Sequence, residues 1–206
     1  HTNSNQGIDT IELKQIAYKY PHSRFNIISD LSCKFEINKN YAIVGKPGSG
    51  KSTLLKIVGG LYESGEGQIM INRTLLSEGQ AIKNYADVMV IPQNPILFGS
   101  TIRDFLDPSD SLDDNAITDA LERCDCRRVV ATLPMGLHTN LSESSEDLSN
   151  AERQRFHVAR VILAQPTILL SDEPTSYLDE TMHRDLIKEL NRSSALHIST
   201  LHRLST

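Results

Sequence analysis

The chain has 206 residues and a mass of 23.0 kDa, the size of one domain or of two small ones. Its 21 basic and 26 acidic residues give a net charge of −5, which argues against a dedicated nucleic-acid-binding protein, because such proteins carry a basic excess. No apolar run approaches the ~20 residues that cross a bilayer. We therefore expect that, if the domain serves a membrane, it does so through a partner or a further part of its chain.

The cysteines and the N-terminus give two minor expectations. Cys33, Cys124 and Cys126 form no C-x-x-C pair, which favours reduced intracellular thiols. Cys124 and Cys126 flank an aspartate, but no second Cys/His pair lies nearby in the sequence, so a zinc site is a weak alternative. Residues 1–7 are polar, and we interpret them as a disordered lead-in or the remnant of a tag.

Hydrophobic patterning predicts strands and helices in alternation. Strands are expected at residues 11–18, 27–37, 41–44, 68–72, 88–91, 167–171 and 196–200, and helices at 51–58, 151–163 and 180–191. From Thr101 to about Arg155 the apolar spacing suits short helices and no strand. This order predicts an α/β protein with a mostly parallel sheet and a helical insertion.

The stretch Gly45-Lys-Pro-Gly-Ser-Gly-Lys-Ser52 fits the pattern G-x-x-x-x-G-K-S in full, between a predicted strand and a predicted helix. Glycines let successive backbone N–H groups point at an anion, and the helix N-terminus adds further donors. The lysine can reach the β- and γ-phosphates, and the serine hydroxyl can bind Mg²⁺. The predicted phosphate-binding residues are Gly45, Lys46, Pro47, Gly48, Ser49, Gly50, Lys51, Ser52 and Thr53.

Two adjacent carboxylates, Asp172 and Glu173, follow the apolar strand at 167–171. A strand that ends at the edge of the phosphate loop can deliver Asp172 to Mg²⁺ and Glu173 to the attacking water. Because adjacent strand residues point to opposite faces, we expect the two acids to take different roles. The alternative is a solvated Asp-Glu pair at a strand end.

With these two motifs in place, the chain resembles the ATP-binding domain of ABC transporters over nearly its whole length, from Ile11 to Thr206. Ala17-Tyr-Lys-Tyr-Pro21 resembles the A-loop of that family, which implies that Tyr20 stacks on the adenine of ATP. Such a stack contributes roughly 1–3 kcal/mol per base. A core tyrosine at a strand end is the alternative.

Three further stretches resemble family loops in the expected order. The Q-loop resemblance at 91–98 implies that Gln93 contacts Mg²⁺ and the water. The D-loop resemblance at 176–179 implies a nucleotide-contacting role for Asp179, and the H-loop resemblance at 199–205 implies that His202 contacts the γ-phosphate. The stretch from Leu97 to Pro108 resembles the exporter branch, where it meets the membrane domain.

The resemblance implies a P-loop NTPase core with an N-terminal antiparallel β subdomain and an inserted helical subdomain. We expect one ATP-binding domain at 8–206, with the helical part at about 95–155. Implied cofactors are ATP and Mg²⁺. Implied partners are a second ABC ATP-binding domain and transmembrane domains, with no nucleic acid, at the cytoplasmic face of a membrane. The implied activity is ATP hydrolysis that powers export of an unknown substrate.

The signature motif departs from the family pattern. The family reads L-S-G-G-Q, whereas this chain reads Leu148-Ser-Asn-Ala-Glu152. Ser149 is retained and can contact the nucleotide of an opposite subunit. Asn150 and Ala151 add Cβ atoms where glycines allow close approach, and Glu152 adds a carboxylate near phosphate, which is unfavourable.

This departure leaves two assemblies open. In a heterodimer, the intact phosphate loop of this chain would work opposite the good signature of a partner; we favour this. In a homodimer, both sites would close poorly and hydrolyse slowly. Alternative functions are a nucleotide-gated dimerisation module with little turnover and a soluble ABC-type ATPase.

Overall fold

The protein is described by a computed structural model that covers residues 7–76, 82–144 and 148–201. It divides into two compact units. The first contains residues 1–90, 167–173 and 195–206, and the second contains residues 91–166 and 174–194. The chain therefore passes between the units several times, and its β7 strand belongs to the first unit although helices of the second precede and follow it.

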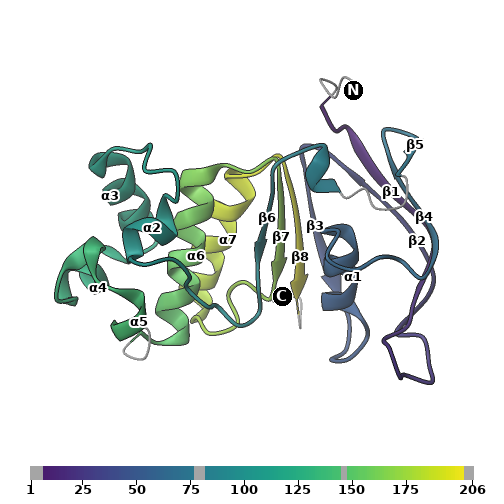
Figure 1. Cartoon of the computed structure of the whole chain (residues 1–206), viewed down its shortest axis with the longest axis horizontal. Coiled ribbons are helices and arrows are strands. Elements are labelled where there is room, and N and C mark those ends of the chain that lie inside the picture. The colour runs from purple at the N-terminus through teal and green to yellow at the C-terminus, as the bar shows by residue number, and fades with distance from the viewer. Residues whose placement is uncertain (1–6, 77–81, 145–147, 202–206) are drawn as a thin grey trace. The chain divides into compact units, whose positions relative to one another are not determined.

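The first unit holds two four-stranded sheets with helix α1 (Lys51–Val58) between them (Figure 1). The first sheet is antiparallel, in the order β2 (Ile28–Glu36), β1 (Thr10–Tyr18), β4 (Glu66–Ile71) and β5 (Thr74–Leu75). The second has the order β3 (Lys39–Val44), β8 (Leu196–Leu201), β7 (Ile168–Asp172) and β6 (Val88–Ile91), with β3, β8 and β7 mutually parallel. A short 3₁₀ helix, η1 (Ile82–Asn84), precedes β6.

Helix α1 joins the two sheets into one core. Its apolar residues Ile57 and Val58 are almost fully buried, in a single cluster with Ile11 of the antiparallel sheet and Leu170 and Ile198 of the parallel sheet. Burial of a side chain of this size contributes roughly 1.5–3 kcal/mol. This packing fixes the direction of α1, and hence the position of its N-terminus.

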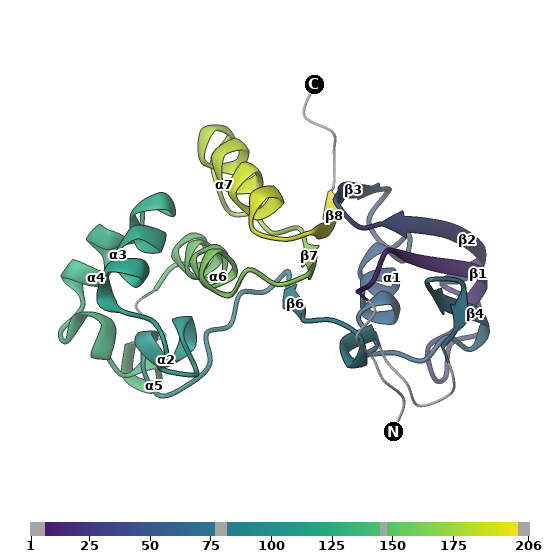
Figure 2. The same cartoon turned by 90° about the horizontal axis from the view of Figure 1, so that it is seen from above.

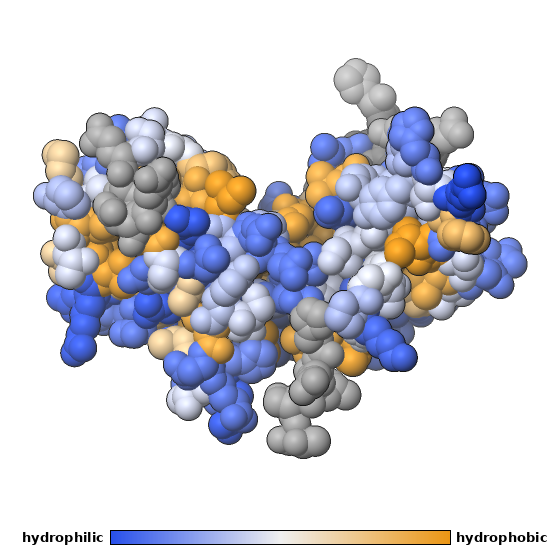
Figure 3. Space-filling model, turned by 90° about the horizontal axis from the view of Figure 1, so that it is seen from below, coloured by the Kyte–Doolittle hydropathy of each residue, from blue (hydrophilic) through white to orange (hydrophobic). Residues whose placement is uncertain are grey.

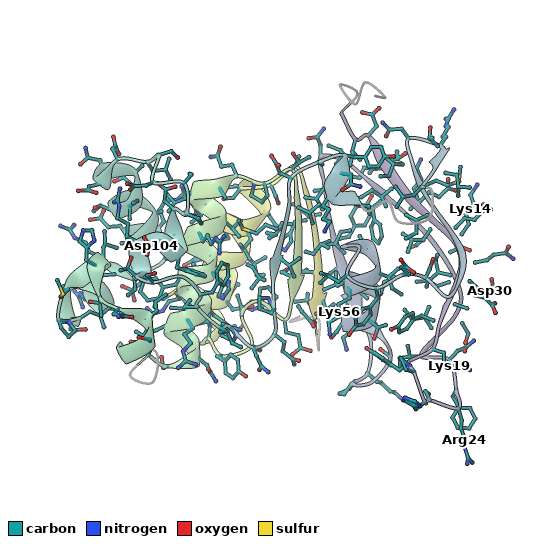
Figure 4. The ribbon with its side chains drawn as sticks, in the orientation of Figure 1. Lys14, Lys19, Arg24, Asp30, Lys56 and Asp104 are labelled. Atoms are coloured by element: carbon teal, nitrogen blue, oxygen red, sulfur yellow. The ribbon has the colours of Figure 1, made fainter. Side chains whose placement is uncertain are left out.

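The second unit is helical, as the sequence predicts. It contains α2 (Ile102–Leu106), α3 (Asp114–Arg123), α4 (Arg127–Thr132), η2 (Gly136–His138), α5 (Leu141–Ser144), α6 (Asn150–Ala164) and α7 (Glu180–Arg192). Helix α6 packs against α2, α3 and α7 (Figure 2). Its Phe156 and the Phe105 of α2 are fully buried. Asp104, labelled in Figure 4, completes a capping box with Thr101 that starts α2.

The predicted elements agree with the structure to within about two residues at most ends. Between Thr101 and Arg155, the described residues form helices and one isolated bridge, Thr101 with Asn140. The two-residue strand β5 is not predicted. None of the helices in the described ranges has the length and apolarity that a bilayer crossing needs.

The three cysteines are free thiols. Cys124 and Cys126 are fully buried, and burial raises the pKa of both thiols, that of Cys126 to about 12. Within 7–76, 82–144 and 148–201, no cluster of three or more His, Cys, Asp or Glu residues suits a metal ion. Both thiols are therefore protonated at neutral pH and serve as small apolar side chains.

Candidate functional site

The phosphate loop links the end of β3 to the start of α1 through residues with left-handed backbone. Gly48 has φ +77° and Gly50 has φ +90°, a region that side chains disfavour. A Cβ on Gly50 would also lie 3.0 Å from the backbone oxygen of Ile27. Gly50 is the N-cap of α1 and brings no side-chain acceptor to the helix. The N–H groups of the first turn can therefore serve an anion.

Lys51 lies inside this loop, at the first position of α1. It is 8% exposed, and its Nζ donates to the backbone oxygens of Gly45 (3.0 Å) and Lys46 (3.2 Å). The ammonium group is thus held against neutral carbonyl oxygens at the centre of the loop. A buried cation with neutral partners favours an anionic ligand, because the ligand supplies the missing charge.

The strand register places Asp172 at the same sheet edge as the loop. Thr200 of β8 pairs with Ile43 of β3 on one side and with Asp172 of β7 on the other. Asp172 is thus two strands from β3, a separation of roughly 10 Å. The loop begins two residues after Ile43, so the carboxylate and the phosphate loop lie at the carboxyl ends of two parallel strands, β7 and β3, that flank β8.

Thr200 connects the two acids that the sequence singles out. Its hydroxyl donates to Oδ1 of Asp172 (2.6 Å) and accepts from the backbone N–H of Glu173 (3.0 Å). Thr200 is fully buried and Glu173 is 9% exposed. Thr200 is not among the site residues predicted from the sequence; its place in the H-loop stretch, two residues before His202, is the signal that could have identified it.

Glu173 differs from its predicted geometry. Strand β7 ends at Asp172, and Glu173 follows it with φ +50°, the left-handed region. The prediction that alternation along a strand separates the two carboxylates is therefore wrong, since only Asp172 belongs to the strand. A left-handed backbone conformation at a non-glycine residue costs about 1–3 kcal/mol of conformational free energy, and residues with such strain are frequent at functional sites.

A buried histidine of β8, His197, is hydrogen-bonded to the neighbouring strand β7. Nε2 of His197 is 2.7 Å from Oγ of Ser171, and both residues are buried. Burial lowers the pKa of His197 to about 4. The imidazole is therefore neutral at neutral pH and brings no positive charge to the paired strands β7 and β8.

Tyr20, the predicted adenine-stacking residue, is tied to the phosphate-loop helix. Its hydroxyl shares a 2.8 Å hydrogen bond with Oγ1 of Thr53, in the first turn of α1, while the residue remains 37% exposed. Its ring is close to perpendicular to those of Tyr18 and Tyr62, with centroid distances of 5.2 and 5.9 Å. Tyr62 is not among the site residues predicted from the sequence; its local signal is an aromatic residue just after the Gly59-Gly60 helix end.

The predicted site residues belong to both units of the structure. The first unit contains Tyr20, residues 45–53, Asp172 and Glu173. The second unit contains Gln93, exposed just after β6, Ser149, the N-cap of α6, and Asp179, the N-cap of α7. Asp179 Oδ1 accepts from the N–H groups of Thr181 and Met182, both at 3.0 Å. His202 lies outside the described residues.

In the signature segment, the side chain of Glu152 is hydrogen-bonded to Ser149 of the same segment. Oε2 of Glu152 accepts from both the N–H (2.8 Å) and the hydroxyl (2.7 Å) of Ser149, and the N–H of Glu152 donates to Oγ of Ser149 (3.2 Å). This is a complete capping box at the start of α6. The hydroxyl proton of Ser149 is therefore already engaged within the chain.

Comparison with known proteins gives consistent matches. A family model described as ABC transporter matches residues 28–176. The chain is 34% identical over 200 residues to an ATP-dependent lipid A-core flippase of Bordetella avium, covering 95% of this chain and 34% of that protein. It is 32% identical over 206 residues to ABC transporter B family member 1 of Arabidopsis thaliana, with coverages of 95% and 16%.

The fold has a solved counterpart with ATP. A bacterial Atm1-family ABC exporter with ATP bound matches with a TM-score of 0.81 and 28% identity, covering 95% of this chain and 35% of that one. The chain thus spans about a third or less of the length of these relatives. With the mixed α/β fold and the phosphate loop in place, the chain belongs to the ABC transporter family and corresponds to the ATP-binding domain of its exporters.

Proposed function

We propose that this domain binds Mg-ATP, closes against a second ATP-binding domain and hydrolyses the nucleotide to power export across a membrane. The observation that carries the proposal is the phosphate loop with its buried Lys51, beside the hydrogen-bonded set Asp172, Thr200 and Glu173 at the same sheet edge. Lys51, Glu173, Gln93 and His202 are the proposed catalytic residues.

The proposed magnesium residues are Ser52, Asp172 and Gln93. Hydroxyl, carboxylate and amide oxygens are the donors that Mg²⁺ prefers. Asp172 is half-buried and uses one oxygen for Thr200, and a carboxylate has about four lone-pair sites, so this bond leaves capacity for a metal. When bound, the ion would neutralise charge on the phosphates.

The chain's own residues account for the hydrolytic step. The loop N–H groups and Lys51 bind and orient the phosphates, and Glu173 accepts a proton from the attacking water. The hydrogen bond from the Glu173 backbone to Thr200 fixes the acid relative to Asp172. Catalysis would thus rest on positioning and on charge stabilisation.

The proposed assembly is a head-to-tail heterodimer. In this proposal Ser149 and Asp179 contact nucleotide across the dimer interface. The capping box at Ser149 supports a heterodimer, because the engaged hydroxyl and the Glu152 carboxylate disfavour a γ-phosphate opposite this segment. Two like charges at 4 Å repel by about 1–4 kcal/mol at dielectric constants of 80 to 20. A second copy would place this obstacle at both sites.

The proposed site of action is the cytoplasmic face of a membrane, in contact with transmembrane domains. In the second unit, Ile96 and Phe98 are 69% and 55% exposed. Figure 3 shows apolar side chains reaching the surface of this unit among hydrophilic ones. Arg160 lies over the Phe98 ring at 4.4 Å, which holds that ring in place at the surface. Such a surface suits docking of a protein partner.

Calorimetric titration of the purified chain tests nucleotide binding directly. We expect saturable binding of Mg-ATP, and the proposal fails if no heat of binding is found at millimolar nucleotide. Single-turnover hydrolysis with the assembled partner then separates an ATPase from a nucleotide-gated dimerisation module, which would bind and close without releasing phosphate.

Changing Glu152 to Gln tests the heterodimer proposal. Gln keeps the capping geometry and removes the charge, so we expect ATP turnover of the pure domain to rise by about fivefold or more, the equivalent of 1 kcal/mol of relieved repulsion. Steady-state phosphate release at saturating Mg-ATP measures the effect.

Asp114→Asn is the matched control, since it removes a first-turn acid from another helix of the same unit, α3. We expect it to leave turnover at the original rate. Brisk hydrolysis by the unaltered pure chain, unchanged by Glu152→Gln, would contradict the heterodimer proposal.

A further inference from the structure

Three tyrosines of the first unit, Tyr18, Tyr20 and Tyr62, form one ring cluster, and Tyr20 is the residue proposed to bind the base. Tyr18 and Tyr62 stack in parallel, with a centroid distance of 5.4 Å and 5° between their planes. The Tyr20 ring is turned by 86° from Tyr18 and by 87° from Tyr62. Perpendicular ring pairs at such distances are favourable beyond their buried area. The stacked pair therefore defines the orientation in which Tyr20 is held.

Tyr62 reaches this cluster because it is fixed to the end of the phosphate-loop helix. Its N–H donates to the backbone oxygen of Lys56 (3.2 Å), as does that of Leu61 (2.8 Å). Nζ of Lys56, whose side chain is labelled in Figure 4, lies 5.3 Å from the Tyr62 ring centroid, a cation–π contact. Tyr62 is thus held by backbone and side-chain contacts to α1.

The same helix holds the other end of Tyr20. The 2.8 Å hydrogen bond between the Tyr20 hydroxyl and Thr53 anchors the ring at the first turn of α1, two residues after Lys51. Tyr20 is therefore fixed at its hydroxyl by the start of α1 and at its ring by Tyr62 after the end of α1. More than a third of the residue remains exposed.

From this arrangement we infer that Tyr62 is a positioning residue for base recognition: it orients Tyr20 before the nucleotide arrives, and couples the base-binding ring to the phosphate-loop helix. The inference rests on the proposed function, in which Tyr20 stacks on adenine. A ring already ordered in the free protein loses little side-chain entropy on binding. Loss of Tyr62 should therefore weaken ATP through its base and leave the phosphate contacts intact.

The experiment compares ATP with tripolyphosphate, which has phosphates and no base, by calorimetry on the 206-residue chain. For Tyr62→Ala we expect ATP to bind about tenfold more weakly, within the range for one base stack, while tripolyphosphate affinity stays within about twofold. Tyr62→Phe keeps the ring and should restore ATP affinity. In the Tyr20→Ala background, Tyr62→Ala should cost nothing further, because the two residues act as a unit.

One control and one replacement variant keep the test specific. Tyr41→Ala removes another half-buried tyrosine of the same core, one whose ring contacts Phe35 and no member of the cluster, and should not change the ratio of the two affinities. If Tyr62→Ala does not fold, Tyr62→Leu keeps the apolar volume without the flat ring and should give the same selective loss.

The inference is overturned if Tyr62 variants weaken both ligands equally, if they leave ATP affinity unchanged, or if their effect adds to that of Tyr20→Ala. If Tyr20→Ala itself leaves the ATP-to-tripolyphosphate ratio unchanged, the proposed adenine stack fails and the role of Tyr62 fails with it. If the unaltered chain binds neither ligand, the proposed function fails, which is a distinct result.

Discussion

Replacing Glu173 with Gln should lower the rate of ATP hydrolysis by about 10²–10⁴-fold, the range for loss of a general base. Gln has the same shape but cannot accept the proton of the attacking water. The change leaves the backbone N–H of residue 173 to donate to Thr200, so the strained backbone and the position of Asp172 are preserved. Phosphate release in a single turnover of the assembled ATPase measures the effect.

The affinity for Mg-ATP separates a chemical effect from a folding defect. We expect Glu173→Gln to bind Mg-ATP as tightly as the unaltered chain, since Glu173 takes no part in phosphate binding in the proposal. Glu180→Gln, an isosteric change at the exposed start of α7, should hydrolyse ATP at the normal rate. A Glu173→Gln protein that keeps a third of the original rate would show that another group is the base.

Local sequence signals were sufficient to place the predicted phosphate loop between a strand and a helix. The phosphate loop is a contiguous run whose glycines, lysine and helix start all lie within eight residues, and the structure places them as the pattern predicts. The alternation of strands and helices likewise predicts the α/β core, because parallel strands need crossover segments between them.

Features that depend on pairing between distant segments could not be predicted. The register of β8 against β3 and β7 brings Thr200 between the phosphate loop and Asp172, although more than 25 residues separate Thr200 from either strand. The left-handed backbone of Glu173 has no local signal either, since glutamate does not favour it. Tyr62 lies beside Tyr20 because α1, which separates the two residues in the sequence, packs between the two sheets.

Replacing Lys51 with Met should weaken binding of Mg-ATP by about 10- to 100-fold, because a charged hydrogen bond contributes about 1.5–3 kcal/mol. The Lys51 ammonium donates to two backbone carbonyl oxygens of its own loop, those of Gly45 and Lys46, and both of these acceptors are neutral. The phosphates would replace these neutral acceptors by anionic ones. Calorimetric titration with Mg-ATP measures the loss, and the affinity for tripolyphosphate should fall in parallel because the base is not involved.

Thermal unfolding in the absence of nucleotide shows whether weaker ATP binding by Lys51→Met comes from the lost charge or from a less stable fold. For stability we expect no loss, in contrast to the loss expected for binding. A buried ammonium group pays a desolvation cost that neutral acceptors offset poorly, so Lys51→Met should fold with equal or greater stability. Lys34→Met, at an exposed lysine of β2 paired with Glu36, should change neither binding nor stability appreciably. The opposite outcome is that Lys51→Met lowers the free energy of unfolding by as much as it weakens the free energy of ATP binding. The lysine would then stabilise the loop structure, and its proposed role as the phosphate-binding cation would be wrong.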